Sequence, residues 1–105
     1  MEIQRLIVGA LQTNCYLVCI KERGDAVVID PGGDAERILS ALGGRTVAAV
    51  LLTHAHFDHT AALGAFKGVP VYLHREDGAM VNDSRLNAGG AFGDTAQRAG
   101  DFRFI

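Results

Sequence analysis

The 105-residue sequence lacks the features that mark several large classes of protein. Its 10 Lys and Arg residues are outnumbered by 12 Asp and Glu, so there is no excess of positive charge for nucleic acid. No basic segment suits a membrane surface, and no apolar run approaches the ~20 residues that a bilayer-spanning helix needs. We therefore expect neither nucleic acid nor a membrane among its partners.

Residues 1–18 also lack the pattern of a secretory signal peptide. Glu2 stands in the region that should be basic, and the polar residues 12–14 interrupt what should be a continuous apolar centre. No small-residue cleavage site follows. We expect a cytoplasmic protein.

Only two cysteines are present, too few for a disulfide scaffold. Cys15 and Cys19 lie four residues apart in an apolar stretch that we interpret as a strand. The even spacing places them on one face but too far apart to form a disulfide. We expect two reduced core residues, and zinc ligation by the pair is the alternative.

Thirteen glycines and a 49% hydrophobic composition indicate a folded chain of short elements. Asp34 is a suitable N-cap for the helix at 35–42, and Gly43 a suitable end. The segment 82–100 shows no periodicity. The predicted strands are 3–8, 14–20, 26–30, 46–53, 69–73 and 102–105, and the predicted helices are 35–42, 60–67 and a turn or two within 74–81.

This order of elements predicts an α/β (α+β) fold with a mixed sheet and helices on one face. No internal repeat or linker divides the chain, so we expect one domain unit over 1–105. The last predicted strand is followed by no cap or polar tail. We therefore expect an incomplete piece of a larger fold.

Three of the four histidines fall within six positions, together with an aspartate: His54, His56, Asp58 and His59. Packing explains such a cluster poorly, because neighbouring imidazoles and a carboxylate in a tight loop need partners. A metal ion satisfies them, since it binds neutral imidazole and carboxylate oxygen. The preceding buried strand places this loop at a carboxyl strand end, where α/β sheets hold their sites.

The spacing favours two ions. His54 and His56 point the same way in an extended segment, whereas Asp58 and His59 follow the turn of the chain and aim at a neighbouring position. One ion bound by all four residues is the second interpretation. A structural zinc and a solvated loop that caps the next helix are the remaining alternatives.

The segment THAHFDH resembles the T-H-x-H-x-D-H signature (HxHxDH) of the metallo-β-lactamase fold superfamily. QTNCYLV and AVVIDPGGD resemble the opening strands of its glyoxalase II-like hydrolases, and VPVYLHREDGAMVND resembles a later segment. The resemblance implies a four-layer αβ/βα sandwich built from two similar halves. Residues 1–105 would be its N-terminal half.

The resemblance also implies a site. His54 and His56 would bind one metal and Asp58 and His59 the other, with a bridging hydroxide as nucleophile that Asp58 helps to orient. Two Zn²⁺ ions are expected, with Fe or Mn as alternatives. Asp30 matches an aspartate that supports the family site, although a strand-end turn residue is the other interpretation.

The family's three further ligands are absent from these 105 residues, so we expect this piece to be inactive alone. His74 is expected on the surface. The glyoxalase II-like segments favour a small-molecule thioester or ester substrate such as S-lactoylglutathione. The alternatives are a non-enzymatic metal-binding module and an iron-dependent oxygenase or oxidoreductase, and self-association could occur through an exposed half-sandwich face.

Overall fold

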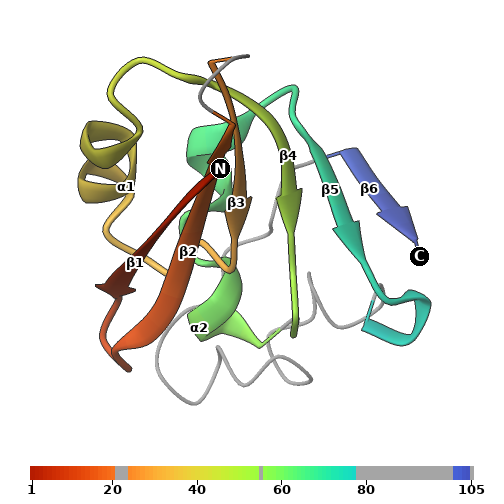
Figure 1. The fold of residues 1–105 in the computed structure, drawn as a ribbon. Coiled ribbons are helices and arrows are strands. Elements are labelled where there is room, and N and C mark those ends of the chain that lie inside the picture. Colours follow the sequence, from red (N-terminus) through yellow and green to blue (C-terminus); the bar gives the residue numbers. More distant parts are fainter. Residues whose placement is uncertain (21–23, 55, 78–100, 105) are drawn as a thin grey trace.

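The computed structural model describes residues 1–20, 24–54, 56–77 and 101–104. In these residues one mixed sheet of six strands runs in chain order from edge to edge (Figure 1). The first three strands pair antiparallel, and the third to sixth pair parallel. The strands are β1 (Glu2–Val8), β2 (Thr13–Ile20), β3 (Asp25–Ile29), β4 (Thr46–Leu51), β5 (Pro70–Leu73) and β6 (Asp101–Phe104). The predicted mixed sheet is confirmed.

Helical segments connect the parallel strands, because parallel neighbours require a crossover. Helix α1 (Ala35–Leu42) joins β3 to β4, and α2 (Phe57–Thr60) with the 3₁₀ turn η1 (Leu63–Phe66) joins β4 to β5. A second 3₁₀ turn, η2 (Arg75–Asp77), follows β5. No helix in the described ranges is long and apolar enough to cross a membrane.

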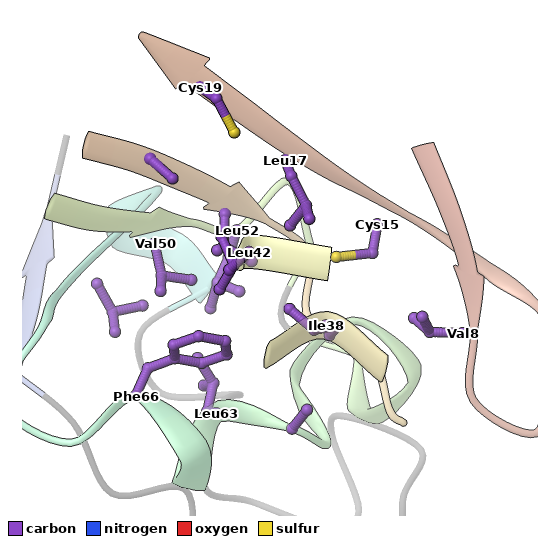
Figure 2. Packing of buried hydrophobic residues seen from close by; sticks show 14 of the residues in the cluster. Val8, Cys15, Leu17, Cys19, Ile38, Leu42, Val50, Leu52, Leu63 and Phe66 are labelled. Atoms are coloured by element: carbon purple, nitrogen blue, oxygen red, sulfur yellow. The ribbon is translucent and has the colours of Figure 1, made fainter. Parts of the chain in front are cut away.

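The core lies between one face of the sheet and the helical segments α1 and η1 (Figure 2). Along β2 every second side chain is buried, so Cys15, Leu17 and Cys19 face inward. Ile38 of α1 and Leu63 of η1 pack against the cluster and are 0% and 1% exposed. Burial of each such large side chain contributes about 1.5–3 kcal/mol. The core therefore holds the sheet and the helical segments together next to the end of β4, after which the histidines follow.

The opposite face of the sheet is also partly apolar. Ile3 and Ile7 of β1 are 67% and 47% exposed, and Val18 and Ile29 are half-buried. Their strand positions alternate with those that face the core. None of the described helices packs on this face.

The predicted helix 60–67 is wrong in its extent. The chain turns helical earlier, at Phe57, and breaks after Thr60 before η1 begins. The Ala62 N–H donates to the Pro31 carbonyl, 2.9 Å away, and this bond draws it out of a continuous helix. Asp58 and His59 are therefore helical residues, not members of the predicted loop.

Helix α1 has the predicted bounds, but its N-cap differs from the expectation. Asp34 occupies the N-cap position with φ 51°, and its side chain makes no capping bond. Its Oδ2 instead accepts the Gly9 N–H at 3.0 Å and lies 3.6 Å from Arg37. A tertiary contact with the β1–β2 turn has replaced the local cap. Gly43 ends the helix in a left-handed conformation, as predicted.

Two strands end before their predicted limits, β3 at Ile29 and β4 at Leu51. Asp30 leaves the strand with φ 56°, and its carboxylate binds Thr53. The predictions for 78–81, 82–100 and 105 lie outside the described residues.

The burial of Cys15 yields a prediction on pH and stability. Burial, with the nearby Asp30 charge, raises the pKa of this thiol to about 12 from 9.0. Above pH 9 the unfolded thiol ionises while the folded one stays neutral, so the free energy of unfolding should fall as pH rises from 9 to 12. In Cys15→Ala this fall should be shallower in urea titrations at pH 8, 9, 10 and 11. Equal slopes for the two proteins would contradict the assignment.

Candidate metal centre

The candidate site lies where the parallel strands β3 and β4 end. Asp30 directly follows β3, and Thr53 and His54 follow β4. The chain then enters α2 with His56 at its N-cap position. This is the carboxyl edge of a parallel pair, where α/β sheets place their functional residues. The predicted location of the loop is confirmed.

The carboxylate of Asp30 holds this edge together. It is 4% exposed, and its Oδ1 accepts the Thr53 backbone N–H at 2.8 Å. Its Oδ2 accepts the Thr53 hydroxyl and lies 3.1 Å from Nδ1 of His59. The Asp30 N–H donates to the Leu51 carbonyl at 3.0 Å. Asp30 thus joins the ends of both strands to α2.

His59 and Asp58 lie together on α2. Nε2 of His59 is 3.5 Å from Oδ2 of Asp58, and both side chains are about one-fifth exposed. Nδ1 of His59 is buried, lies 3.1 Å from Oδ2 of Asp30 and makes no aligned hydrogen bond within the described residues. With Asp30 beside Nδ1, Nε2 is the ring nitrogen left to coordinate a metal ion.

His54 and His56 are more exposed. Their ring centroids lie 6.1 Å apart, and the His54 ring is 5.1 Å from that of His59. Nδ1 of His54 is 3.1 Å from the Thr53 hydroxyl oxygen. The His56 carbonyl accepts the His59 N–H at 2.9 Å. The three rings are therefore neighbours at one edge of the sheet.

In the part of the chain that the structure describes, no three His, Cys, Asp or Glu side chains converge as ligands of a single ion. The donors approach one another in pairs. Their chemistry nevertheless fits a metal, because three imidazoles and a carboxylate are ligands that zinc, iron and manganese accept. The carboxylate behind His59 adds the outer partner that metal-binding histidines usually have.

A cavity of about 440 Å³ opens beside these residues. Asp58 and His59 form part of its wall, and the β1–β2 turn and the start of β2 form another part. Ligand sites typically have volumes of this order, from about 300 to 1,000 Å³. The lining residues are Leu11, Gln12, Thr13, Asn14, Tyr16, Asp30, Thr53, Asp58 and His59.

Two residues at this site were not predicted from the sequence. The hydroxyl of Thr13 donates to Oδ2 of Asp58 at 2.9 Å. A Cβ on Gly32 would stand 1.7 Å from the Asp58 carbonyl oxygen. Thr13 shares a strand face with Cys15, so a hydroxyl in a row of buried apolar side chains was the available signal. Nothing in the sequence marked Gly32, since close approaches depend on tertiary packing.

Other candidates lie apart from this arrangement. His74 is exposed, as predicted, and its Nδ1 accepts the Glu76 N–H at 3.1 Å. Cys15 and Cys19 are free and buried in the core, as expected. Within the described ranges the pair belongs to no potential metal cluster.

This chain combines a mixed sheet, helical segments over one face and a histidine-rich loop at the carboxyl edge, and its sequence relatives include a probable metallo-hydrolase. Residues 8–102 match the model of the Metallo-beta-lactamase superfamily, and the chain belongs to this superfamily. Solved structures agree. The chain superposes on the BLEG-1 B3 metallo-beta-lactamase with a TM-score of 0.88 and 35% identity, over 99% of this chain and 53% of that one.

Another similar structure is that of TTHA1623 in a di-iron-bound form, with a TM-score of 0.78 and 35% identity over 97% of this chain and 53% of that one. Among sequence relatives, the probable metallo-hydrolase YqgX of Bacillus subtilis is 37% identical over 86% of this chain and 44% of its own length. Hydroxyacylglutathione hydrolase GloC of Haemophilus influenzae is 34% identical over 89% and 46%. The chain thus spans about half the length of these relatives.

The contact at Gly32 yields a stability prediction. In Gly32→Ala the new methyl group would overlap the Asp58 carbonyl oxygen, so α2 must shift. We expect the free energy of unfolding to fall by about 1–3 kcal/mol in urea titrations. Gly64→Ala is the matched control, because a Cβ there meets nothing within 4 Å. If both variants were equally stable, the close approach of Gly32 to α2 would be wrong.

Proposed function

We propose that this chain carries part of the active site of a metal-dependent hydrolase that binds two metal ions and cleaves a thioester or ester. One observation supports this above all: His54, His56, Asp58 and His59 gather at one carboxyl edge of the sheet, with the Asp30 carboxylate 3.1 Å behind His59. Membership of a metallo-hydrolase superfamily supports the same proposal.

In this proposal His54 and His56 hold one ion, and Asp58 and His59 hold the other. Bound metal ions would lower the pKa of a coordinated water, so that hydroxide is available as the nucleophile at neutral pH, and would polarise the substrate carbonyl. The Asp30 carboxylate lies 3.1 Å from Nδ1 of His59, so Nε2 is the ring nitrogen left for the metal. Asp58 also helps to orient the nucleophile. The remaining ligands of a complete site would come from outside these residues.

Zinc is the proposed metal because imidazole and carboxylate are its usual ligands in catalytic sites. Iron is the second candidate, and the similar structure in a di-iron-bound form favours it. Elemental analysis of the full-length protein after purification separates the two. Zinc as the major bound metal would support the first proposal, and iron the second.

The proposed substrate is a small thioester of the S-lactoylglutathione type. The name of the relative GloC supports this substrate, and the cavity beside Asp58 has a volume suited to a small molecule. A β-lactam is the competing substrate, because one similar structure is a B3 metallo-beta-lactamase.

The substrate proposal is tested with the full-length, metal-loaded protein. We expect hydrolysis of S-lactoylglutathione, followed as loss of thioester absorbance, and a much lower kcat/KM for a chromogenic cephalosporin. Higher kcat/KM for the cephalosporin would overturn the thioester proposal but leave the hydrolase proposal intact. Hydrolysis of neither compound would count against both substrates.

The ligand roles are tested by His56→Ala in the same protein. Removing one donor should reduce the bound metal and abolish hydrolysis, because a metal site with one ligand fewer binds more weakly. The control is the substitution Cys19→Ser. Cys19 lies in the core on β2, so this variant should leave kcat/KM largely unchanged. Greater loss of activity in Cys19→Ser than in His56→Ala would mean that the site is assigned to the wrong residues.

A further inference from the structure

Thr13 stands at the first position of β2 and is 7% exposed. Its side chain falls on the sheet face that packs against the helices, two residues before the fully buried Cys15. Burying a hydroxyl group on that face destabilises the folded protein unless the hydroxyl has a hydrogen-bond partner. The partner is distant in the sequence: Thr13 donates to Oδ2 of Asp58, 2.9 Å away and 45 residues along the chain.

The same aspartate is fixed at its backbone. A Cβ on Gly32 would lie 1.7 Å from the Asp58 carbonyl oxygen and 3.3 Å from Cβ of Thr13. Thr13, Gly32 and Asp58 therefore meet in one tight contact. The β3–α1 loop limits where the Asp58 backbone can lie, and β2 limits where its carboxylate can turn.

The two carboxylate oxygens of Asp58 are not equivalent. Oδ2 receives the Thr13 hydrogen bond and lies 3.5 Å from Nε2 of His59. Oδ1 makes no hydrogen bond with any residue in the described ranges. A hydrogen bond to an ionised carboxylate is shorter and stronger than a neutral one, so it restricts the rotation of the group.

We propose that Thr13 is a positioning residue for Asp58: its hydroxyl holds the carboxylate in the orientation in which Asp58 and His59 bind a metal ion together. The inference rests on the proposed metal site and extends it to a residue of β2. Groups that orient metal ligands commonly change metal affinity by about 10- to 100-fold when they are removed.

The test is the binding of Co²⁺ to the full-length protein, followed by its visible absorption. Thr13→Val removes the hydroxyl but keeps the volume and β-branching that suit a strand. We expect a Co²⁺ affinity about 10- to 100-fold lower and an altered absorption band, which a packing role alone would not change. Thr13→Ser retains the hydroxyl and should restore both the affinity and the band.

Cys15→Ala is the matched control, because it changes the next inward side chain of the same strand, which belongs to the hydrophobic core. It should lower stability and leave Co²⁺ affinity and absorption unchanged. Thr13→Val with unchanged Co²⁺ affinity and band would overturn the inference, since Thr13 would then have only a packing role. If His59→Ala also left Co²⁺ binding unchanged, the proposed metal site itself would be wrong.

Discussion

The buried carboxylate of Asp30 is the group on which the histidine-rich edge of this sheet depends. A carboxylate that is 4% exposed costs free energy unless it is paired, and Asp30 receives its bonds from Thr53 and lies 3.1 Å from His59. These partners come from the end of β4 and from α2, while Asp30 itself ends β3. Satisfying one buried charge thus sets the relative positions of three segments. The potential metal ligands at 54–59 lie on the two segments, the end of β4 and α2, that Asp30 holds together.

Close backbone packing supports the same edge from below. Gly9 lies where a side chain would overlap the Gly32 carbonyl oxygen, at 2.7 Å, and a Cβ on Gly33 would come within 2.6 Å of Cα of Gly9. The β1–β2 turn is therefore pressed against the β3–α1 loop, and that loop in turn lies against Asp58. This contact explains how Thr13, at the start of β2, reaches α2. The helix-covered core stabilises the sheet, whereas these glycine contacts set how closely the β1–β2 turn, the β3–α1 loop and Asp58 approach one another.

Much of the fold could be predicted because local patterns and tertiary packing agree. The strand predicted over 14–20 and the helix 35–42 with Gly43 at its end are as the sequence indicates. Predictions failed where a distant partner took a backbone or side-chain group. The Ala62 N–H bonds to Pro31 and breaks the helix expected over 60–67, and Asp34 bonds to Gly9 instead of capping its own helix. A local pattern contains no information on such partners.

The sequence by itself determined the chemical character of this protein. The residue types of His54, His56, Asp58 and His59 indicate metal ligands, and their position after a buried strand predicts that they lie at the sheet edge. Both inferences are possible because ligand chemistry and strand geometry are local properties. Only the tertiary structure decided that Asp30 lies against His59 and that Thr13 holds Asp58. These pairs are separated by 29 and 45 positions in the sequence, so nothing but the packing of β2, β3 and α2 brings them within hydrogen-bonding distance.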